Sequence, residues 1–442
     1  MVEDAYIIQG GKILRGEVQL SGAKNIALKT MIAALLFDGP VTLHNVPRIR
    51  DVDELINLIR HIGGEADFVA KNTLVVNGKN IGENRLDFLY AAKVRVSFMF
   101  FAPLLYKFHQ AFIPNPGGCR LGARSINRVI AGMEALGIRV TYDSTTGYYR
   151  AQMNEKPKGR FRFEKPSHTG TEMMIILSVL SDNQIVIENA ALEPEVDDLI
   201  NFLNRSGAAI KREGTTIKIR GVGSLKQSDP YVIACDRNEA ATFICLALAS
   251  RGEVVVSDIP KNYIGALVEA LERAGAQVKQ IKANHWYFAY SRPLRAVNIE
   301  TTPYPGFMTD WQPLWAVLMT QAHGVSQIHE RLFENRFSYV DELKKLGANI
   351  EFINLPVVHP EQYYFFNYSE KSSYSQAIKV TGPQQLHNGV LTVGDLRAGA
   401  TLAIAALIAQ GESVVSGVSI LERGYEDFVA KVRALGGTIK KV

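Results

Sequence analysis

The sequence has few cysteines and no long hydrophobic run. Its three cysteines, Cys119, Cys235 and Cys245, are widely separated and form no CxxC pair, which excludes a disulfide framework and a thiolate zinc site. No two histidines have metal-ligand spacing, so no metal is expected. The longest apolar segment, residues 97–106, has half the length that a bilayer crossing needs, and no basic start precedes an apolar stretch at the N-terminus. We therefore expect a cytoplasmic protein that does not bind membranes.

An excess of charge of one sign is also missing. The 49 lysines and arginines nearly balance the 44 aspartates and glutamates, which leaves a net charge of +5 and no long basic run. A nucleic-acid partner is therefore not expected, whereas a small anionic substrate is compatible with this balance. The composition, 47% hydrophobic and 21% charged, is typical of globular proteins, and 442 residues exceed what one hydrophobic core serves. At least two domains are expected.

One small unit recurs six times along the chain. In each copy a helix-like segment ends at a glycine and is followed by a β-type stretch, as in LERAGAQV and LKKLGANI. A glycine in this place adopts the left-handed conformation that ends a helix. The successive intervals between these glycines are 74, 70, 68, 72 and 89 residues. The glycines are Gly63, Gly137, Gly207, Gly275, Gly347 and Gly436.

A second helix is predicted in several copies of the unit. Alanine-rich segments that are apolar nearly all round occur at residues 25–36, 240–249 and 398–409. Helices of this kind are buried, so we expect them inside, with sheets packed over them. Six units of about 70 residues favour an α/β fold of two lobes with three units each, since 70 residues exceed the usual solenoid period.

The last interval exceeds its neighbours by about 19 residues and marks an insertion at about residues 355–389. Five aromatic residues lie within its segment 360–376: Tyr363, Tyr364, Phe365, Phe366 and Tyr368. Two interpretations are open, a surface hairpin that buries its own apolar face and a contact between subunits. We favour the hairpin, because surface loops accept insertions freely.

The loop NPGGCRLGAR, residues 115–124, is the first candidate for chemistry. Two glycines precede its Cys119, and two arginines follow within five residues. A flexible, electropositive loop favours the thiolate and makes a cysteine reactive. Cys245, within TFICLALA, is expected in the core, and Cys235 is interpreted as structural.

Several cations form a second group of candidates. Lys24 in SGAKN stands just before a buried helix, where its ammonium group and the backbone N–H groups would cradle an anion. Guanidinium groups that converge on one cleft would suit a small, multiply charged anion. The candidates next to small or turn residues are Arg95, Arg237, Arg336, Arg397 and Arg423. The simpler interpretation is surface ion pairs, which is favoured by the nearby Asp236, Glu334 and Asp395.

Two residues before predicted helices complete the set. Asp310 lies in the turn TTPYPGFMTDWQ, residues 301–312, ahead of an apolar helix. A carboxylate there either accepts a proton from a sugar hydroxyl or caps the helix, and the cap is the simpler interpretation. His168, in KPSHTGTE, is interpreted as a surface or capping residue.

Seven motifs follow the order found in bacterial UDP-N-acetylglucosamine enolpyruvyltransferases: SGAKN, PGGCRLGAR, ENAALEPEVDDLINFL, PYPGFMTDWQ, FENRF, DLRAGA and ERGYE. The chain resembles this family from about residue 8 to its C-terminus. Members transfer the enolpyruvyl group of phosphoenolpyruvate to the 3-hydroxyl of the nucleotide sugar, release phosphate and commit the sugar to peptidoglycan synthesis. The resemblance implies an inside-out α/β barrel, in which each of two lobes has three βαβαββ-type units.

The resemblance also implies how the chain divides and which residues act. Residues 1–22 plus 235–442 would form the C-terminal lobe and 23–234 the N-terminal lobe with the Cys119 loop, with the active site between them. Cys119 resembles the proton donor to phosphoenolpyruvate, which can become covalently attached to it. Asp310 resembles the carboxylate that takes the proton of the sugar hydroxyl. Lys24 and Arg397 are further catalytic candidates.

Ligand sets follow from the same resemblance. The implied phosphoenolpyruvate ligands are Lys24, Asn25, Arg124, Arg336, Arg397 and Arg423. The implied nucleotide-sugar ligands are Asn25, Arg95, Arg124, Ser125, Ile126, Asn127, Arg128, Lys165, Pro166, Ser167, His168, Asp310 and Leu332. The resemblance implies no cofactor and no metal, and we expect a monomer.

Three segments depart from the family pattern. The usual Pro-Val-Asp-Leu-His, Ser-Val-Gly-Ala-Thr and His-Leu-Asp-Arg-Gly are replaced at residues 125–129, 167–171 and 420–424. Two alternatives stay open for this reason. One is enolpyruvyl transfer to another acceptor, as in enolpyruvyl-shikimate-phosphate synthase, against which Cys119 and the PYPGF segment argue. The other is a non-catalytic paralogue that binds a nucleotide sugar, against which Cys119, Lys24 and Asp310 argue.

Overall fold

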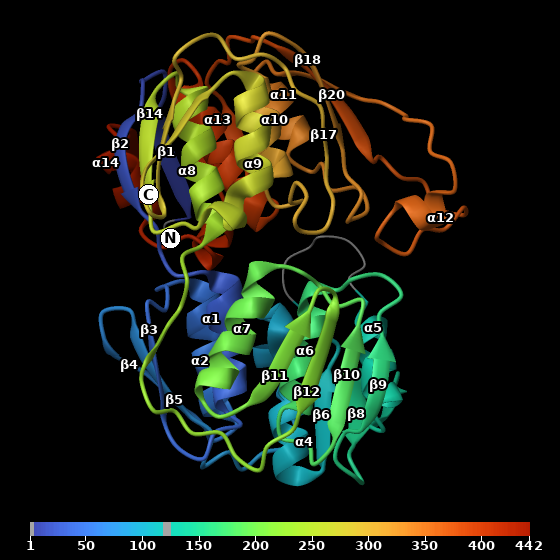
Figure 1. The fold of residues 1–442 in the computed structure, drawn as a ribbon. Helices are drawn as coiled ribbons and strands as arrows, with labels where there is room; N and C mark the ends of the chain where they lie inside the picture. The colour runs from blue at the N-terminus through green and yellow to red at the C-terminus, as the bar shows by residue number, and fades with distance from the viewer. Residues whose placement is uncertain (1–3, 118–124) are drawn as a thin grey trace. The chain divides into compact units, whose positions relative to one another are not determined.

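The structure is a computed structural model that describes residues 4–117 and 125–442. The described residues form two compact units (Figure 1). Unit 1 contains residues 4–21 and 235–442, and unit 2 contains residues 22–117 and 125–234. Within the described ranges, no helix combines the length and the apolar character that a membrane crossing requires.

Unit 1 contains three four-stranded sheets with one common topology. In each sheet, the first strand is parallel to the second, and the remaining neighbours are antiparallel. In spatial order the strands are β21 (Val390–Thr392), β22 (Glu412–Ser416), β1 (Ala5–Gln9) and β23 (Thr438–Lys441); β2 (Arg15–Gln19), β14 (Glu253–Ser257), β16 (His285–Ala289) and β15 (Gln277–Lys282); β17 (Ile299–Glu300), β18 (Gly324–His329), β20 (Ala377–Gly382) and β19 (Asn349–Phe352).

Unit 2 repeats this topology. Two of its sheets have the same four-strand pattern, and the third has three strands, with an isolated parallel bridge from Arg85 to Phe112 in the place of a fourth. In spatial order the strands are β13 (Tyr231–Val232), β3 (Val41–His44), β5 (Thr73–Asn77) and β4 (Glu65–Ala70); β9 (Gly159–Arg162), β10 (Gln184–Glu188), β12 (Thr216–Arg220) and β11 (Ala209–Glu213); β6 (Gln110–Pro114), β8 (Tyr148–Gln152) and β7 (Arg139–Asp143).

Each repeat contributes an amphipathic helix that ends at one of the six glycines predicted from the sequence. All six glycines have positive φ, between 87° and 101°, as the helix-stop interpretation requires. The prediction of six helix ends is therefore confirmed. These helices are α2 (Arg50–His61), α5 (Asn127–Ala135), α7 (Pro194–Arg205), α9 (Lys261–Ala274), α11 (Val340–Lys345) and α14 (Phe428–Ala434).

A second set of helices forms the cores. Every residue of α8 is buried, as are all but one of the residues of α13, and α8, α10 and α13 contact one another in unit 1 (Figure 1). Small alanine side chains allow this close approach while large apolar neighbours fill the remaining space. The predicted buried helices at 25–36, 240–249 and 398–409 are thus confirmed. The set comprises α1 (Lys24–Ala34), α4 (Phe101–Phe108), α6 (His168–Ser178), α8 (Arg237–Ala249), α10 (Gln312–Met319) and α13 (Leu396–Ile408).

The two ends of the described chain meet in one sheet. Strand β1 lies between β22 and β23, and it is antiparallel to both. The backbone N–H of Ala5 donates to Val442 O at 3.0 Å, and the N–H of Val442 donates back at 2.9 Å. Figure 1 marks both ends at this sheet. The N-terminal strands β1 and β2 are consequently part of unit 1.

The insertion lies between β19 and β20, at residues 353–376. In four of the other repeats the equivalent strands are joined by short turns, such as Gly214 and Thr215 between β11 and β12, and in the fifth they are the terminal strands β1 and β23. The predicted hairpin is wrong: residues 353–376, all of which are described, contain one helical turn, α12 (Pro360–Tyr363), and no strand. Its aromatic rings pack on one another instead, and Tyr364 and Phe366 are buried with ring centroids 4.9 Å apart.

Candidate active site

Three predicted site residues meet at one carboxylate in unit 1. Asp310 precedes α10, and its Oδ1 atom is 2.7 Å from Arg336 Nη2. Its Oδ2 atom is 3.2 Å from Nε of Arg397, the second residue of α13. Both guanidinium groups are buried, whereas 23% of the Asp310 side chain is exposed. The carboxylate is therefore the accessible member of this cluster.

The same two arginines keep buried donors that no described residue accepts. Arg336 Nε and Arg397 Nη1 are both shielded from solvent and lack a hydrogen-bond partner within the described part of the chain. Guanidinium groups bind phosphate and carboxylate groups by charge-assisted hydrogen bonds, so these donors suit an anion.

Asp310 is ionised at neutral pH. Burial alone would raise its pKa, but Arg336 and Arg397 outweigh burial and hold the pKa below the usual value. Burial would likewise lower the pKa of Arg397, but Tyr425 and Asp310 raise it overall. The carboxylate is thus kept in the form that accepts a hydrogen bond from a hydroxyl group.

Two simpler interpretations of these residues are wrong. The N-cap of α10 is Trp311, and within the described structure no side chain caps that helix, so Asp310 is not a cap. Asp395 does not pair with the guanidinium group of its neighbour Arg397; its Oδ1 atom accepts the backbone N–H of that residue at 3.0 Å and caps α13. The acidic neighbour is a helix cap, and the ion pair of the arginine is with a residue distant in sequence.

A buried relay behind Arg336 was not predicted. Arg336 Nη1 donates to Thr309 Oγ1 at 2.7 Å, and Thr309 Oγ1 donates to Glu330 Oε2 at 2.7 Å. Glu330 is fully buried, and its Oε1 atom accepts the hydroxyl of Thr301 at 2.9 Å and the backbone N–H of the predicted Leu332 at 2.8 Å. A single glutamate in a charged stretch carries no sequence signal that distinguishes this role.

Tyr425, two residues after the predicted Arg423, contacts the cluster. Arg423 is the last residue of η2 (Val418–Arg423). The ring centroid of Tyr425 lies 5.5 Å from Arg397 Cζ, and its hydroxyl is 2.7 Å from Thr242 Oγ1 on α8. The ERGYE motif therefore supports α13 by a cation–π contact.

In unit 2 the predicted residues gather at helix N-termini. Lys24 is the first residue of α1, with Asn25 next to it, and its Nζ is 2.6 Å from Asp51 Oδ2. Ser125 Oγ accepts the backbone N–H of Asn127, which starts α5, at 3.1 Å. The remaining predicted residues lie at the start of η1 (Arg95–Phe100), of α5 and of α6: Arg95, Ile126, Arg128, Lys165, Pro166, Ser167 and His168. Cys119 and Arg124 lie outside the described residues.

His168 belongs to a buried ion cluster. Ser167, and not His168, caps α6 through a bond from Gly170 N, so the capping interpretation is wrong. His168 Nε2 is 3.3 Å from Glu172 Oε1, and Lys29 Nζ is 3.0 Å from Glu172 Oε2. Burial would lower the pKa of His168, but Glu172 outweighs it and raises the pKa. This cluster joins α1 to α6, and no sequence pattern indicated it.

The other two cysteines are ordinary protonated thiols. Burial raises the pKa of Cys245 to about 12. Burial, together with Asp258 and Glu239, also raises the pKa of Cys235 to about 12. Both agree with the predicted structural roles.

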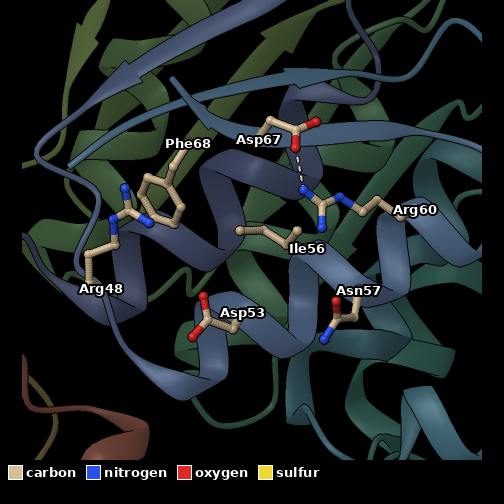
Figure 2. Close-up of a pocket in the computed structure, with 7 residues that line it drawn as sticks. All are labelled: Arg48, Asp53, Ile56, Asn57, Arg60, Asp67 and Phe68. Atoms are coloured by element: carbon tan, nitrogen blue, oxygen red, sulfur yellow. Dashed lines mark hydrogen bonds and ion pairs between the residues drawn. The ribbon is translucent and has the colours of Figure 1, made fainter. Parts of the chain in front are cut away.

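An open pocket of about 310 Å³ lies elsewhere on unit 2 (Figure 2). Arg60 pairs with Asp67 there, and Arg48 Cζ lies 3.5 Å from the ring centroid of Phe68. With Asp53, the pocket has two cations and two anions, so it does not select a highly charged anion. None of the predicted site residues within the described ranges lines it.

Comparison with known proteins defines the class. The chain matches the family described as EPSP synthase (3-phosphoshikimate 1-carboxyvinyltransferase) over residues 8–432. The enolpyruvyl transferase NikO from Streptomyces tendae has the same fold, with a TM-score of 0.84, 23% identity and coverage of 100% of this chain and 99% of that one. EPSP synthase from Acinetobacter baumannii follows with a TM-score of 0.73 and 15% identity, covering 99% and 100%. The chain belongs to this family of enolpyruvyl transferases.

More similar relatives carry a more specific name. UDP-N-acetylglucosamine 1-carboxyvinyltransferase from Dichelobacter nodosus is 37% identical over 98% of both chains. The enzyme of that name from Halothermothrix orenii is 37% identical over 99% of both. The predicted family and fold class are therefore confirmed.

Proposed function

We propose that the protein transfers the enolpyruvyl group of phosphoenolpyruvate to the 3-hydroxyl of UDP-N-acetylglucosamine and releases phosphate. The observation that carries the proposal is the ionised Asp310 between two buried arginines that retain unsatisfied donors. The names of the relatives support the acceptor. We place the reaction in the cytoplasm, at the first committed step of peptidoglycan precursor synthesis, and expect a monomer whose domains are residues 1–22 plus 235–442 and 23–234.

Phosphoenolpyruvate, the donor of the enolpyruvyl group, carries at most three negative charges, which lie on its phosphate and its carboxylate. Guanidinium and ammonium groups bind both by charge-assisted hydrogen bonds. Arg397 Nη1 and Arg336 Nε supply two such donors. The proposed ligands are Lys24, Asn25, Arg124, Arg336, Arg397 and Arg423.

The reaction needs an acid and a base that act on different partners. Cys119 would give a proton to the methylene carbon of the donor, which makes the neighbouring carbon electrophilic. Asp310 would take the proton of the 3-hydroxyl as its oxygen bonds to that carbon. The Cys119 thiolate would then take back a proton from the new methyl group as phosphate leaves with the proton held by Asp310, which restores the double bond. The nucleotide sugar would contact the starts of η1, α5 and α6, together with Leu332 and Asp310.

Phosphate release is the direct test. Purified protein with both UDP-N-acetylglucosamine and phosphoenolpyruvate is expected to release inorganic phosphate, and neither substrate alone is expected to suffice. Shikimate 3-phosphate in place of the nucleotide sugar tests the alternative acceptor. Binding of the nucleotide sugar by calorimetry, without phosphate release under reducing conditions, would identify a non-catalytic binding protein instead.

Selective alkylation tests the role of Cys119. A small epoxide of the fosfomycin type is expected to add to Cys119, because two arginines within five residues favour its thiolate. Cys235 and Cys245 serve as internal controls, since their pKa values of about 12 keep them protonated. Peptide mass spectrometry that finds the adduct only on these two residues would refute the assignment.

A further inference from the structure

The end of the insertion keeps a backbone contact that the repeats share. In four repeats, a backbone carbonyl accepts a hydrogen bond from a backbone N–H of a nearby loop. The carbonyl belongs to the residue just before β5, β12, β16 or β20, and the N–H belongs to the loop just after β3, β10, β14 or β18, respectively. The four donor and acceptor pairs, at 2.8 to 2.9 Å, are Val46 with Asn72, Ala190 with Thr215, Ile259 with Asn284, and Glu330 with Gln376. The last residue of the 353–376 insertion therefore has the same position as the last turn residue of the other three repeats.

Gln376 adds three side-chain hydrogen bonds to this contact. Its Nε2 atom donates to Glu330 O at 2.8 Å and to Phe333 O at 2.9 Å, and its Oε1 atom accepts the backbone N–H of Asn335 at 2.7 Å. Ser375 N donates to Asn335 Oδ1 at 2.6 Å. Gln376 is only 5% exposed, so these bonds satisfy backbone groups that would otherwise be buried without partners.

The aromatic part of the insertion contacts the start of segment 330–336. Phe365 N donates to Arg331 O at 2.8 Å, and Arg331 Nη2 donates to Tyr363 O at 3.0 Å. The Tyr363 ring stacks against the Arg331 guanidinium group at 3.8 Å. His329 is 3.2 Å from the hydroxyl groups of both Tyr363 and Tyr364. The insertion thus contacts segment 330–336 at several points along its length.

That segment supports the proposed catalytic carboxylate. Glu330 accepts a hydrogen bond from the hydroxyl group of Thr309, and this hydroxyl group accepts one from Arg336. Arg336 in turn forms an ion pair with Asp310. We propose that the insertion is a positioning element for the acceptor site, and that Gln376 is a positioning residue which fixes segment 330–336 so that Arg336 stays on Asp310. This inference rests on the proposed function for its catalytic consequence, but its structural part does not.

Gln376→Met tests the proposal, because methionine has a similar volume and length but makes none of the three bonds. We expect kcat to fall about tenfold through misalignment of Asp310. The acidic limb of the kcat profile should move to higher pH, since a displaced Arg336 no longer lowers the pKa of Asp310. Amide hydrogen exchange at residues 332–335 should become faster.

Two further variants separate positioning from general stability. Asn284→Gly alters the equivalent turn of another repeat in unit 1, and we expect it to leave kcat, its pH profile and exchange at 332–335 unchanged. Gln376→Glu keeps the acceptor for Asn335 but turns a buried carboxylate oxygen toward the carbonyls of Glu330 and Phe333, so an effect at least as large as that of Gln376→Met is expected. Equal behaviour of the Gln376 variants and Asn284→Gly in both kcat profile and exchange would overturn the proposal. Absence of turnover in the unmodified protein would instead contradict the proposed function. Hydrogen exchange at residues 332–335 would still test whether Gln376 fixes segment 330–336.

Discussion

Replacing Asp310 with asparagine is expected to lower kcat by roughly a thousandfold, within the range that a general base contributes. The amide has nearly the same shape but does not take the proton of a hydroxyl group. It also leaves Arg336 and Arg397 without the carboxylate that they share. Phosphate release at saturating concentrations of both substrates measures the effect.

Glu334→Gln is the matched control for this variant. Glu334 lies two residues from Arg336 in FENRF, but Arg336 pairs with Asp310. Its replacement is expected to leave kcat within about twofold, which is a few tenths of a kcal/mol in activation free energy. Similar losses in both variants, or retention of a tenth of the activity in Asp310→Asn, would contradict the role of Asp310.

Asp310 also contributes to stability in a pH-dependent way. Its folded-state pKa lies below its ordinary value, so its contribution is present above that ordinary value and is lost as the pH falls through the folded-state pKa. The difference in unfolding free energy between the protein and Asp310→Asn should therefore be constant near neutral pH and shrink only in strong acid.

Lys29→Met is expected to cause the largest loss of stability, about 3–5 kcal/mol, the usual cost of removing one partner from a buried ion pair. Glu172 is fully buried, and Lys29 and His168 are its cationic partners. Methionine fills the space of the lysine stem but leaves the carboxylate with His168 alone. Denaturant unfolding followed by circular dichroism measures the difference.

The size of this loss should depend on pH. Because the pKa of His168 is raised in the folded state, its stabilising charge is present below the unfolded pKa and is lost as the pH rises through the folded value. The charged and titratable groups that act on it are Glu172, Lys29 and Glu193. Lys29→Met should therefore cost more at pH 9 than at pH 6, where the imidazolium still faces Glu172.

Two variants serve as controls for the buried cluster. Lys211→Met removes a lysine whose partner Glu213 is exposed, and no change in unfolding is expected. Adding Glu172→Gln to Lys29→Met removes the stranded charge and should restore part of the lost stability. An equal loss in Lys211→Met, or a double variant less stable than Lys29→Met, would contradict the assignment.

The architecture could be predicted because its signals are local. A glycine at positive φ after an amphipathic helix needs only its neighbours, and six copies such as Gly275 and Gly347 established the repeat. The pairing of β1 with β22 and β23 has no local signal, since its partners are more than 400 residues away. The resemblance to a known family was needed to expect that exchange of strands.

The site shows the same limit more sharply. The motifs named Asp310, Arg336 and Arg397, but not their contacts. Arg397 has an acidic residue two positions before it, yet that residue caps a helix, and the ion pair is made 87 positions away with Asp310. Gln376 gave no signal because a single glutamine in a loop has no period or motif. The aromatic run was interpreted as part of a hairpin, but its rings pack against one another in a segment without strands.

Strand β1 lies inside the sheet that contains both ends of the described chain, so this sheet is completed only late in protein synthesis. Strand β1 leaves the ribosome before its neighbour β23, which lies more than 400 residues later in the sequence. At about 5–20 residues per second, β1 stays without that neighbour for tens of seconds. The described residues of unit 2 lie between the two described segments of unit 1 in the sequence, so they are translated before most of unit 1. The arginine cluster of unit 1, formed by Arg336 and Arg397 with Asp310, is therefore completed late in biosynthesis.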